Sequence, residues 1–365
     1  MKSDAYRGLG TGLVLALTLA GVRAGHAQSG RTSTQSSVPS PRNAILVVID
    51  GVRWQEVFRG GDCSLMTNAQ GVEDTLALRA AFCRGDRDSA RAALMPFLWS
   101  TIAKDGAVLG DRDRGEDAHI GNAMKFSYPG YNEILTGAAD PRIDKNDFGP
   151  NPNITVFERL ANDPRFRGKV RAWGTWDVFD AIFNEPRAGF PVRSGWETPF
   201  PGPRDAVERE LNALWATTTR QWSYMPPDAF LQRAVLQSIR KDGPRALFVG
   251  FGEPDEWAHR RRYDNYLQSL HAADGYLREL WDAVQADRHY RGVTSLIVVT
   301  DHGRGRTPES WTDHGREVEG AEEIWVAALF GGNAGVAGGP RRLVISPFVQ
   351  AEVAPLYMEL IGFGE

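Results

Sequence analysis

The chain has 365 residues, of which 42% are hydrophobic and 24% charged, and this composition excludes a fibrous or intrinsically disordered protein. Its formal net charge is −4 and its pI is about 6.0, so no overall basic charge favours binding to nucleic acid or to an anionic membrane. The length allows one large core, or a core with an inserted cap.

Residues 1–27 have the pattern of an export signal. Lys2 and Arg7 form a positive region, residues 9–22 form an apolar stretch, and residues 25–27 (Gly-His-Ala) form a small-residue cleavage site. An uncleaved membrane anchor is the alternative, but glycines and threonines interrupt the apolar run, which is shorter than the ~20 residues of a spanning helix. We therefore expect a signal peptide, a periplasmic or secreted protein, and no membrane span in the mature chain.

Residues 28–42 are rich in Ser, Thr, Gln and Pro, which predicts a disordered leader before a catalytic domain over residues 43–365. Cys63 and Cys83 are the only cysteines. In an oxidising compartment an even count predicts a mutual disulfide, with two separate thiols as the alternative. Neither cysteine has another Cys or a His at ligand spacing, so a thiolate zinc site is not expected.

Three continuous apolar runs predict parallel strands buried on both faces: residues 43–49, 245–251 and 294–299. These runs lead into Asp50, into Glu253-Pro254-Asp255 and into Asp301-His302. Acidic residues are therefore expected at the carboxyl ends of the strands, where open parallel sheets bind their ligands. Weaker strand candidates are residues 169–173, 323–330 and 342–346.

Helical patterns lie between the predicted strands, and the clearest is an apolar stripe with i, i+3, i+4 spacing over residues 266–284. The alternation predicts a doubly wound α/β fold, a mostly parallel sheet sandwiched by helices. Residues 176–240 are rich in Trp, Pro and Arg and contain one good helix, 228–239, with Asp228 as its N-cap. We interpret this stretch as a cap or insertion over the edge of the sheet.

The segment 125–137 (KFSYPGYNEILTG) predicts a helix that begins at a serine. Pro129 suits the first turn and Gly137 ends the helix, so Ser127 lies at the amino terminus. Free backbone amides and the helix dipole attract an anion there, and the serine could attack a phosphoryl group held by those amides. A simple N-capping serine is the alternative, and the partners of Ser127 decide between the two readings.

Six acidic and histidine residues are the expected partners. Asp255 and His259 lie four apart, so both face one side of a helical turn and can chelate one ion. Carboxylate and imidazole ligands without thiolate suit Zn²⁺, with Mn²⁺, Fe and Co²⁺ as alternatives. Any one pair alone is more often a solvated charge or a core histidine, but three acidic strand ends with histidines favour a metal site. The six are Asp50, Asp255, His259, Asp301, His302 and His314.

Taken in order, these motifs resemble the alkaline phosphatase superfamily, most closely its nucleotide pyrophosphatase/phosphodiesterase and related phosphatase branches. The matching segments are Val-Val-Ile-Asp50-Gly-Val-Arg, Ser127-Tyr-Pro with Leu-Thr-Gly137, Pro254-Asp255-x-x-x-His259, and Thr-Asp301-His302-Gly. The resemblance spans residues 45–315 and implies two divalent metal ions, the first held by Asp255, His259 and His314. It implies that Asp50, Asp301, His302 and the Ser127 oxygen hold the second, and that a phosphoserine forms on Ser127.

The sequence departs from the family pattern at two positions. Nucleotide pyrophosphatases commonly have threonine where this chain has Ser127, whereas alkaline phosphatases have serine, so small phosphate monoesters and diesters both remain candidates. The last histidine of nucleotide pyrophosphatases lies far downstream, whereas here His314 takes that place by elimination among the seven histidines. The neighbouring Asp313 is expected to be a solvated loop acid.

A further side chain is expected to stabilise the non-bridging phosphoryl oxygens. Lys125, two residues before the nucleophile, is one candidate, although a solvated lysine is an equal alternative. An asparagine is the other, from Asn132, Asn146 or Asn151.

Competing functions come from the same superfamily and from outside catalysis. Sulfatases require arginine where this chain has Tyr131, and their oxygen-rich calcium site differs from a site rich in histidine. A sulfatase or phosphonate hydrolase is therefore the first alternative. A non-catalytic metal-binding scaffold is the second, and it would have lost a ligand or the nucleophile, yet every expected position is filled.

Overall fold

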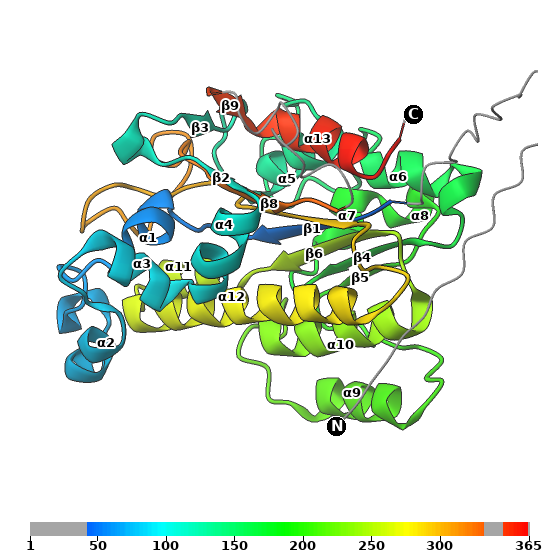
Figure 1. The fold of residues 1–365 in the computed structure, drawn as a ribbon, viewed down its shortest axis with the longest axis horizontal. Helices are drawn as coiled ribbons and strands as arrows, with labels where there is room; N and C mark the ends of the chain where they lie inside the picture. The colour runs from blue at the N-terminus through cyan, green and yellow to red at the C-terminus, as the bar shows by residue number, and fades with distance from the viewer. Residues whose placement is uncertain (1–41, 332–345, 364–365) are drawn as a thin grey trace, which may run out of the picture. The chain divides into compact units, whose positions relative to one another are not determined.

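A computed structural model describes residues 42–331 and 346–363 of the chain (Figure 1). The predicted signal peptide 1–27, the leader residues 28–41 and most of the strand candidate 342–346 lie outside the described residues. None of the helices within the described ranges is long and apolar enough to cross a membrane.

A seven-stranded sheet forms the centre of the fold, with strand order β2-β8-β7-β1-β6-β4-β5. The strands are β1 (Asn43–Ile49), β2 (Ala107–Leu109), β4 (Val170–Gly174), β5 (Val192–Ser194), β6 (Ala246–Phe251), β7 (Thr294–Val299) and β8 (Val326–Leu329). β1 pairs in parallel with both β6 and β7, and β4 is parallel to β5 and β6, whereas β8 runs antiparallel to β7 and to β2. The predicted mostly parallel sheet is therefore confirmed. A small second sheet pairs β3 (Ala118–His119) with β9 (Phe348–Val349).

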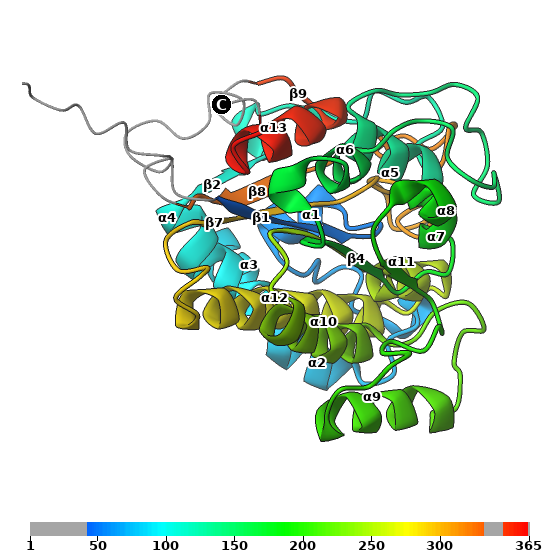
Figure 2. The same ribbon diagram turned by 90° about the vertical axis from the view of Figure 1, so that its right-hand side faces the viewer.

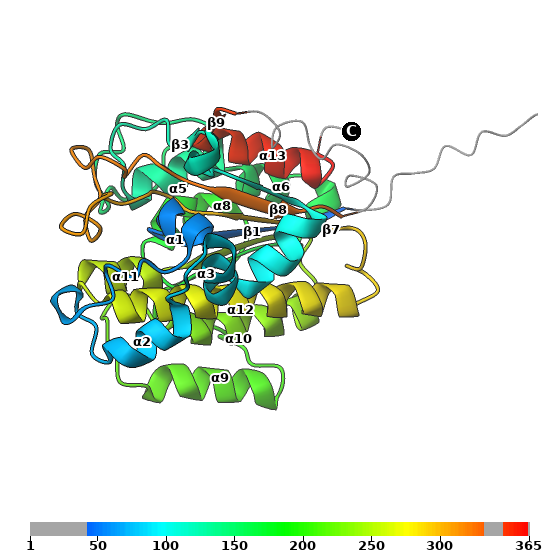
Figure 3. The same ribbon diagram turned by 60° about the vertical axis from the view of Figure 1, so that its left-hand side comes forward.

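Helices cover both faces of the sheet (Figures 1, 2 and 3). One face carries α5 (Ser127–Thr136), α6 (Val156–Ala161), α7 (Phe179–Phe183), α8 (Glu185–Ala188) and α13 (Val353–Leu360). The other face carries α10 (Asp228–Asp242), α12 (Tyr263–Ala286), α3 (Arg87–Leu94) and α4 (Ala103–Asp105). The remaining helices are α1 (Trp54–Arg59), α2 (Thr75–Phe82), α9 (Ala206–Thr217) and α11 (Glu253–His259).

The central strand explains the continuous apolar run from which it was predicted. Ile45 and Val47 belong to the core that includes apolar side chains of α10 and α12. Leu46 and Val48 alternate with them and belong to the core on the α5 and α13 side. Because successive residues of a strand point to opposite faces, a strand covered on both sides needs apolar residues at every position.

Two of the strongest strand predictions, residues 43–49 and 294–299, coincide with β1 and β7. The third, residues 245–251, is confirmed as β6 without its first residue. The weaker candidates 169–173 and 323–330 correspond to β4 and β8 with shifted ends.

The predicted cap, residues 176–240, contributes directly to these layers. It includes the edge strand β5 and most of α10. The expectation that Asp228 caps its own helix is wrong: Pro227 holds the N-cap position of α10, and Asp228 is the first helical residue. Its carboxylate instead accepts hydrogen bonds from the backbone amides of Gly252 (2.9 Å) and Glu253 (3.1 Å), at the start of α11.

The predicted disulfide between Cys63 and Cys83 is confirmed, with a Cα–Cα distance of 5.3 Å. It joins the loop after α1 to the C-cap of α2, because Cys83 directly follows that helix. The bond therefore closes a loop that follows Asp50 in the chain.

Candidate metal centre

The carboxyl ends of three adjacent parallel strands bring the predicted ligands together. Asp50 follows β1, Asp301 and His302 follow β7, and Asp255 lies in the first turn of α11, just after β6. The backbone amide of Gly51 donates a 3.0 Å hydrogen bond to Asp301 Oδ1 and so joins two of these strand ends. Gly51 itself has φ +62°, and a Cβ there would collide with the Asp255 carboxylate, so this position requires glycine.

His302 lies at the centre of the first group of ligands. Its Nε2 is 3.4 Å from Asp50 Oδ1, 3.4 Å from Asp301 Oδ2 and 3.4 Å from Ser127 Oγ. Its Nδ1 is 2.9 Å from the carbonyl oxygen of Gly303, which can only accept, so Nδ1 carries the proton. Its Nε2 therefore faces the carboxylates and Ser127.

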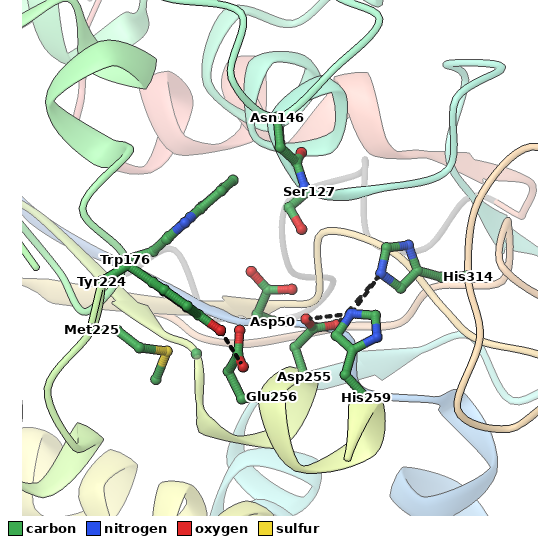
Figure 4. A pocket seen from close by; sticks show the side chains of 11 residues that line it. Asp50, Ser127, Asn146, Trp176, Tyr224, Met225, Asp255, Glu256, His259 and His314 are labelled. Carbon is green, nitrogen blue, oxygen red and sulfur yellow. Dashed lines mark hydrogen bonds and ion pairs between the residues drawn. The ribbon is translucent and has the colours of Figure 1, made fainter. Parts of the chain in front are cut away.

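A second group lies beside the first and contains Asp255, His259 and His314 (Figure 4). His259 Nε2 is 3.1 Å from Asp255 Oδ2 and 3.0 Å from His314 Nε2. His314 Nε2 is also 3.9 Å from Asp255 Oδ1, and its ring stacks on that of His302 with centroids 4.0 Å apart. The loop histidine selected by elimination thus lies with the residues expected to share its ion.

Burial and neighbouring charges shift the pKa values of several of these residues. Burial, followed by the neighbouring carboxylates Asp301 and Asp255, raises the pKa of Asp50 well above its usual value. Burial and the charge of Asp255 raise the pKa of Asp301 to about 7. Burial and His302 lower the pKa of His314 to about 2, so His314 is neutral and offers a lone pair.

The residues of both groups fit divalent cations. Asp50 Oδ1, Asp301 Oδ2 and His314 Nδ1 are buried without a hydrogen-bond partner in the described part of the chain. Donor atoms within 4.8 Å of one another form two sets, Asp50-Asp301-His302 and Asp255-His302-His314. Buried carboxylate oxygens that repel one another and face imidazole nitrogens are suited to bind a cation that balances them. His302 belongs to both sets and therefore lies between the two candidate ion positions.

Ser127 is the first residue of α5, as its sequence predicts, and Gly137 ends that helix in a left-handed conformation. The serine is buried and faces His302. The next turn supports the same centre, because the Tyr131 hydroxyl donates a 3.0 Å hydrogen bond to Asp50 Oδ2. Tyr131, the residue that argues against a sulfatase motif, thus holds a predicted metal ligand.

One residue of the centre was missed by sequence reasoning. Arg304 is buried and donates from Nε to the Gly51 carbonyl (2.9 Å), from Nη1 to the Thr312 carbonyl, and from Nη2 to the Asp255 carboxylate. Arg304 directly follows the Thr-Asp-His-Gly motif, and that position was the available signal. The sequence alone does not connect Arg304 to Asp255.

Asparagine 146, rather than the other two candidates, lies in the pocket beside Ser127 (Figure 4). Its Oδ1 accepts a 3.0 Å hydrogen bond from the Tyr128 backbone amide, which leaves its NH₂ group to face a ligand. Asn132 and Asn151 are buried and bonded to each other at 3.2 Å. Lys125 is not brought into the pocket, because its ammonium group pairs with Glu322 at 2.8 Å.

A second wall of the pocket over the candidate metal centre consists of residues that the sequence did not identify individually. Trp176, Tyr224 and Met225 come from the predicted cap, and Glu256 follows Asp255 in α11. Figure 4 shows this wall across from His259 and His314.

Comparisons with known proteins agree with this fold and centre. A family model described as the metalloenzyme superfamily matches residues 194–318, which include five of the six predicted Asp and His ligands. The solved lipoteichoic acid synthase LtaP from Listeria monocytogenes is 12% identical, with a TM-score of 0.53 over 88% of this chain and 72% of that chain. The zinc complex of the periplasmic domain of EptC from Escherichia coli is also 12% identical, with a TM-score of 0.53 over 90% of this chain and 84% of that one.

A third solved structure, a protein in the alkaline phosphatase superfamily from Vibrio parahaemolyticus, is 11% identical over 88% of this chain and 67% of that chain, with a TM-score of 0.48. No curated protein shows significant sequence similarity to this chain. The predicted resemblance to the alkaline phosphatase superfamily is confirmed at the level of the fold, and the strand ends hold candidate metal-binding Asp and His groups.

Proposed function

We propose that this chain is an exported hydrolase of phosphate esters that uses Ser127 as its nucleophile and two divalent metal ions. The observation that carries the proposal is the position of Ser127 Oγ, at the amino terminus of α5 and 3.4 Å from His302 Nε2. A serine hydroxyl beside two adjoining groups of carboxylates and imidazoles is suited to attack on phosphorus. Zinc is the proposed metal because the ligands are nitrogen and oxygen atoms without thiolate, and the EptC domain of similar fold was solved with zinc.

Asp50, Asp301 and His302 would hold one ion with the Ser127 oxygen, and Asp255, His259 and His314 the other. Ions bound there supply Lewis-acid stabilisation of negative charge on the serine and phosphoryl oxygens. Ser127 Oγ would lose its proton and form a bond to phosphorus while the bond to the leaving alcohol breaks and the leaving oxygen takes up a proton. Water would then hydrolyse the phosphoserine, which releases the phosphoryl group and restores the serine hydroxyl.

Other side chains orient these groups. The NH₂ group of Asn146 can donate to a non-bridging oxygen, since the Asn146 carbonyl is engaged by Tyr128. The amino terminus of α5 adds favourable potential for the bound anion. Lys125 is not assigned this role, because Glu322 pairs with it.

Export is supported by the signal-like sequence of residues 1–27 and by the disulfide, which persists in oxidising compartments. The proposed substrate is a small phosphate ester. The net charge of −4 gives no support for nucleic acid as a partner.

Replacing the nucleophile tests the proposal. Ser127→Ala in metal-loaded protein should lower kcat by about three orders of magnitude or more, because covalent catalysis is lost. Metal content, measured by plasma mass spectrometry, should remain close to two ions because only one ligand is removed. Ser127→Thr should retain measurable turnover, since it keeps a hydroxyl. Ser100→Ala, at an exposed serine, serves as the control.

The assay should compare an aryl phosphate monoester, a diester, a phosphonate and a sulfate ester. Phosphopeptide mapping after quenched turnover should place the label on Ser127. Near-normal activity of the alanine variant, or label on another residue, would reject the nucleophile. Preference for the sulfate ester would favour a sulfatase, and two bound ions without turnover of any ester would favour a scaffold.

A further inference from the structure

Glu256 places a carboxylate in the wall of the pocket, away from the predicted metal ligands. Its Oε2 accepts a 2.6 Å hydrogen bond from the Tyr224 hydroxyl, and both residues line the pocket with Trp176 and Met225. Figure 4 shows Glu256 below the Tyr224 ring, on the side of the pocket opposite His314. The wall therefore combines two aromatic rings, one thioether and one negative charge.

Within the described residues, Glu256 forms no ion pair. The nearby Arg260 directs its guanidinium over the rings of Trp222 and Trp257, at 5.2 and 6.0 Å from their centroids. Asp255, by contrast, is paired with Arg304 and His259. Cations at the metal centre would balance Asp50 and Asp255, so Glu256 is the carboxylate of the pocket that is left for a ligand to pair.

The aromatic members of the wall favour the same kind of ligand. The faces of tryptophan and tyrosine rings attract cations, and recognition of quaternary ammonium groups by aromatic side chains beside a carboxylate follows from this attraction. Trp176 and Tyr224 supply two such rings next to the carboxylate, and Met225 adds a polarisable apolar contact. A simple phosphate dianion would gain nothing from this wall, because Glu256 repels it.

We propose that this wall selects phosphate esters that carry an ammonium cation, with the phosphoryl group at Ser127 and the cation between Glu256 and the rings of Trp176 and Tyr224. The inference rests on the proposed phosphate-ester chemistry and adds the class of substrate. It assigns Glu256 to substrate recognition and not to metal binding.

Glu256 could instead serve only to hold Tyr224 in place, and two variants separate these roles. Glu256→Gln removes the charge but keeps an oxygen that can accept the Tyr224 hydrogen bond. Tyr224→Phe removes that hydrogen bond but keeps the charge and an aromatic face. Glu210→Gln, at an exposed position in α9, removes one negative charge at a residue that does not line the pocket and is the matched control.

The probes are pairs of esters that differ only in charge. Phosphocholine is compared with 3,3-dimethylbutyl phosphate, and the 4-nitrophenyl diesters of both alcohols are compared in the same way. Wild-type protein should show about tenfold higher kcat/KM for the cationic member of the pair that it hydrolyses, which corresponds to about 1.4 kcal/mol. The ratio should fall to about one in Glu256→Gln, and should persist in Tyr224→Phe and Glu210→Gln.

Calorimetric binding of the same pairs to metal-loaded Ser127→Ala gives a readout that does not need turnover. If wild-type protein hydrolyses none of the phosphate esters, in these pairs or in the aryl panel, the proposed function fails, and the binding preference alone still decides the role of Glu256. Equal affinity for charged and uncharged esters overturns the inference. So does a preference that survives in Glu256→Gln, or the loss of a metal ion from that variant, which would make Glu256 a ligand.

Discussion

Arg304 joins three segments that carry predicted metal ligands. Its guanidinium contacts the carbonyl of Gly51, next to Asp50, and that of Thr312, two residues before His314, as well as Asp255 itself. Burial by itself raises the pKa of Asp255, but the charge of Arg304, followed by His259, holds that pKa well below its usual value. Asp255 thus keeps an ionised carboxylate with one oxygen on Arg304 and the other facing His259.

We predict that Arg304→Met weakens the ion held by Asp255, His259 and His314 by at least about tenfold, as is typical when a residue that orients a metal ligand is lost. The variant leaves Asp255 unpaired and two backbone carbonyls without a donor. Calorimetric titration of the chelated protein with Zn²⁺ should show the affinity of one site reduced more than that of the other.

Arg316→Met is the matched control, because Arg316 is an exposed arginine of the same loop. Thermal unfolding separates a folded variant with a weakened site from one that has lost its structure. Two sites of wild-type affinity in folded Arg304→Met would contradict the positioning role.

Most of the predicted metal ligands could be found in the sequence because they follow a recognisable strand end or, like His259, lie at helical spacing from another candidate. His314 has neither feature and was selected by elimination. The residues that position these ligands and the substrate could not be predicted, since their contacts join segments far apart in the chain. The position of Asn146 beside Ser127 depends on how the loop after α5 returns to the helix, so sequence alone left three asparagines as candidates. Lys125 was a candidate because it is near Ser127 in sequence, but its partner in the structure, Glu322, is 197 residues away in the chain.

At the scale of elements, α5 lies so close to the end of β7 that its second turn requires glycine. A Cβ at Gly130 would lie 2.5 Å from the carbonyl oxygen of Asp301, a distance that forces a shift of the backbone. Gly130 lies three residues after Ser127 in the same helix, so such a shift would move the nucleophile relative to Asp301 and His302.

We predict that Gly130→Ala destabilises the protein and lowers kcat by at least about tenfold, because displacing a catalytic group by a fraction of an ångström to 1 Å has effects of this order or larger. Gly275→Ala is the control in another helix. No atom lies within 4 Å of a Cβ at Gly275, so that change should stabilise α12 by up to about 1 kcal/mol. Gly130→Ala should therefore lower both the unfolding midpoint and kcat, whereas Gly275→Ala should raise the unfolding midpoint and leave kcat unchanged. Equal behaviour of the two variants would argue against close packing of α5 on β7.

The central strands could be predicted because both of their faces are buried, which gives continuous apolar runs. α12 could be predicted because it is long and has one buried apolar stripe. The short strands β2, β3, β5 and β9 were not predicted, since runs of two or three residues have no distinct periodicity. Asp228 shows a different limit: the residue type correctly indicated a helix start, but its carboxylate caps α11 instead of α10. Which helix receives such a cap depends on tertiary packing.

At the scale of the whole molecule, the candidate metal centre connects segments that are widely separated in the sequence of the folded unit. Asp50 follows the first strand, Ser127 begins α5, and His314 lies beyond β7. The fold must hold Asp50, Asp255 and Asp301 close together in a buried place, where without cations they repel one another. Metal binding should therefore stabilise the entire unit and not only the loops at the sheet edge.

The last prediction concerns how this stabilisation depends on pH. Without metal, Asp301 has a pKa of about 7 in the folded protein, raised by burial and Asp255 from an unfolded value of about 3.9. Folded protein then binds more protons than unfolded protein between these values, so its free energy of unfolding falls as pH rises through about 7. Asp50, whose pKa is also raised, acts in the same direction, whereas Asp255 is ionised throughout this range.

Bound cations replace those protons and pair the carboxylates, so the difference in Tm between metal-loaded and chelated protein should widen from pH 5 to pH 8. Each site should add about 2.7 kcal/mol when free metal exceeds its Kd a hundredfold. Scanning calorimetry with and without chelator measures this difference. In chelated Asp301→Asn the decline of Tm with pH should be smaller, because one of the two carboxyl groups with a raised pKa is gone. A difference in Tm that stays constant or narrows towards pH 8 would show that Asp301 and Asp50 do not bind the stabilising ions.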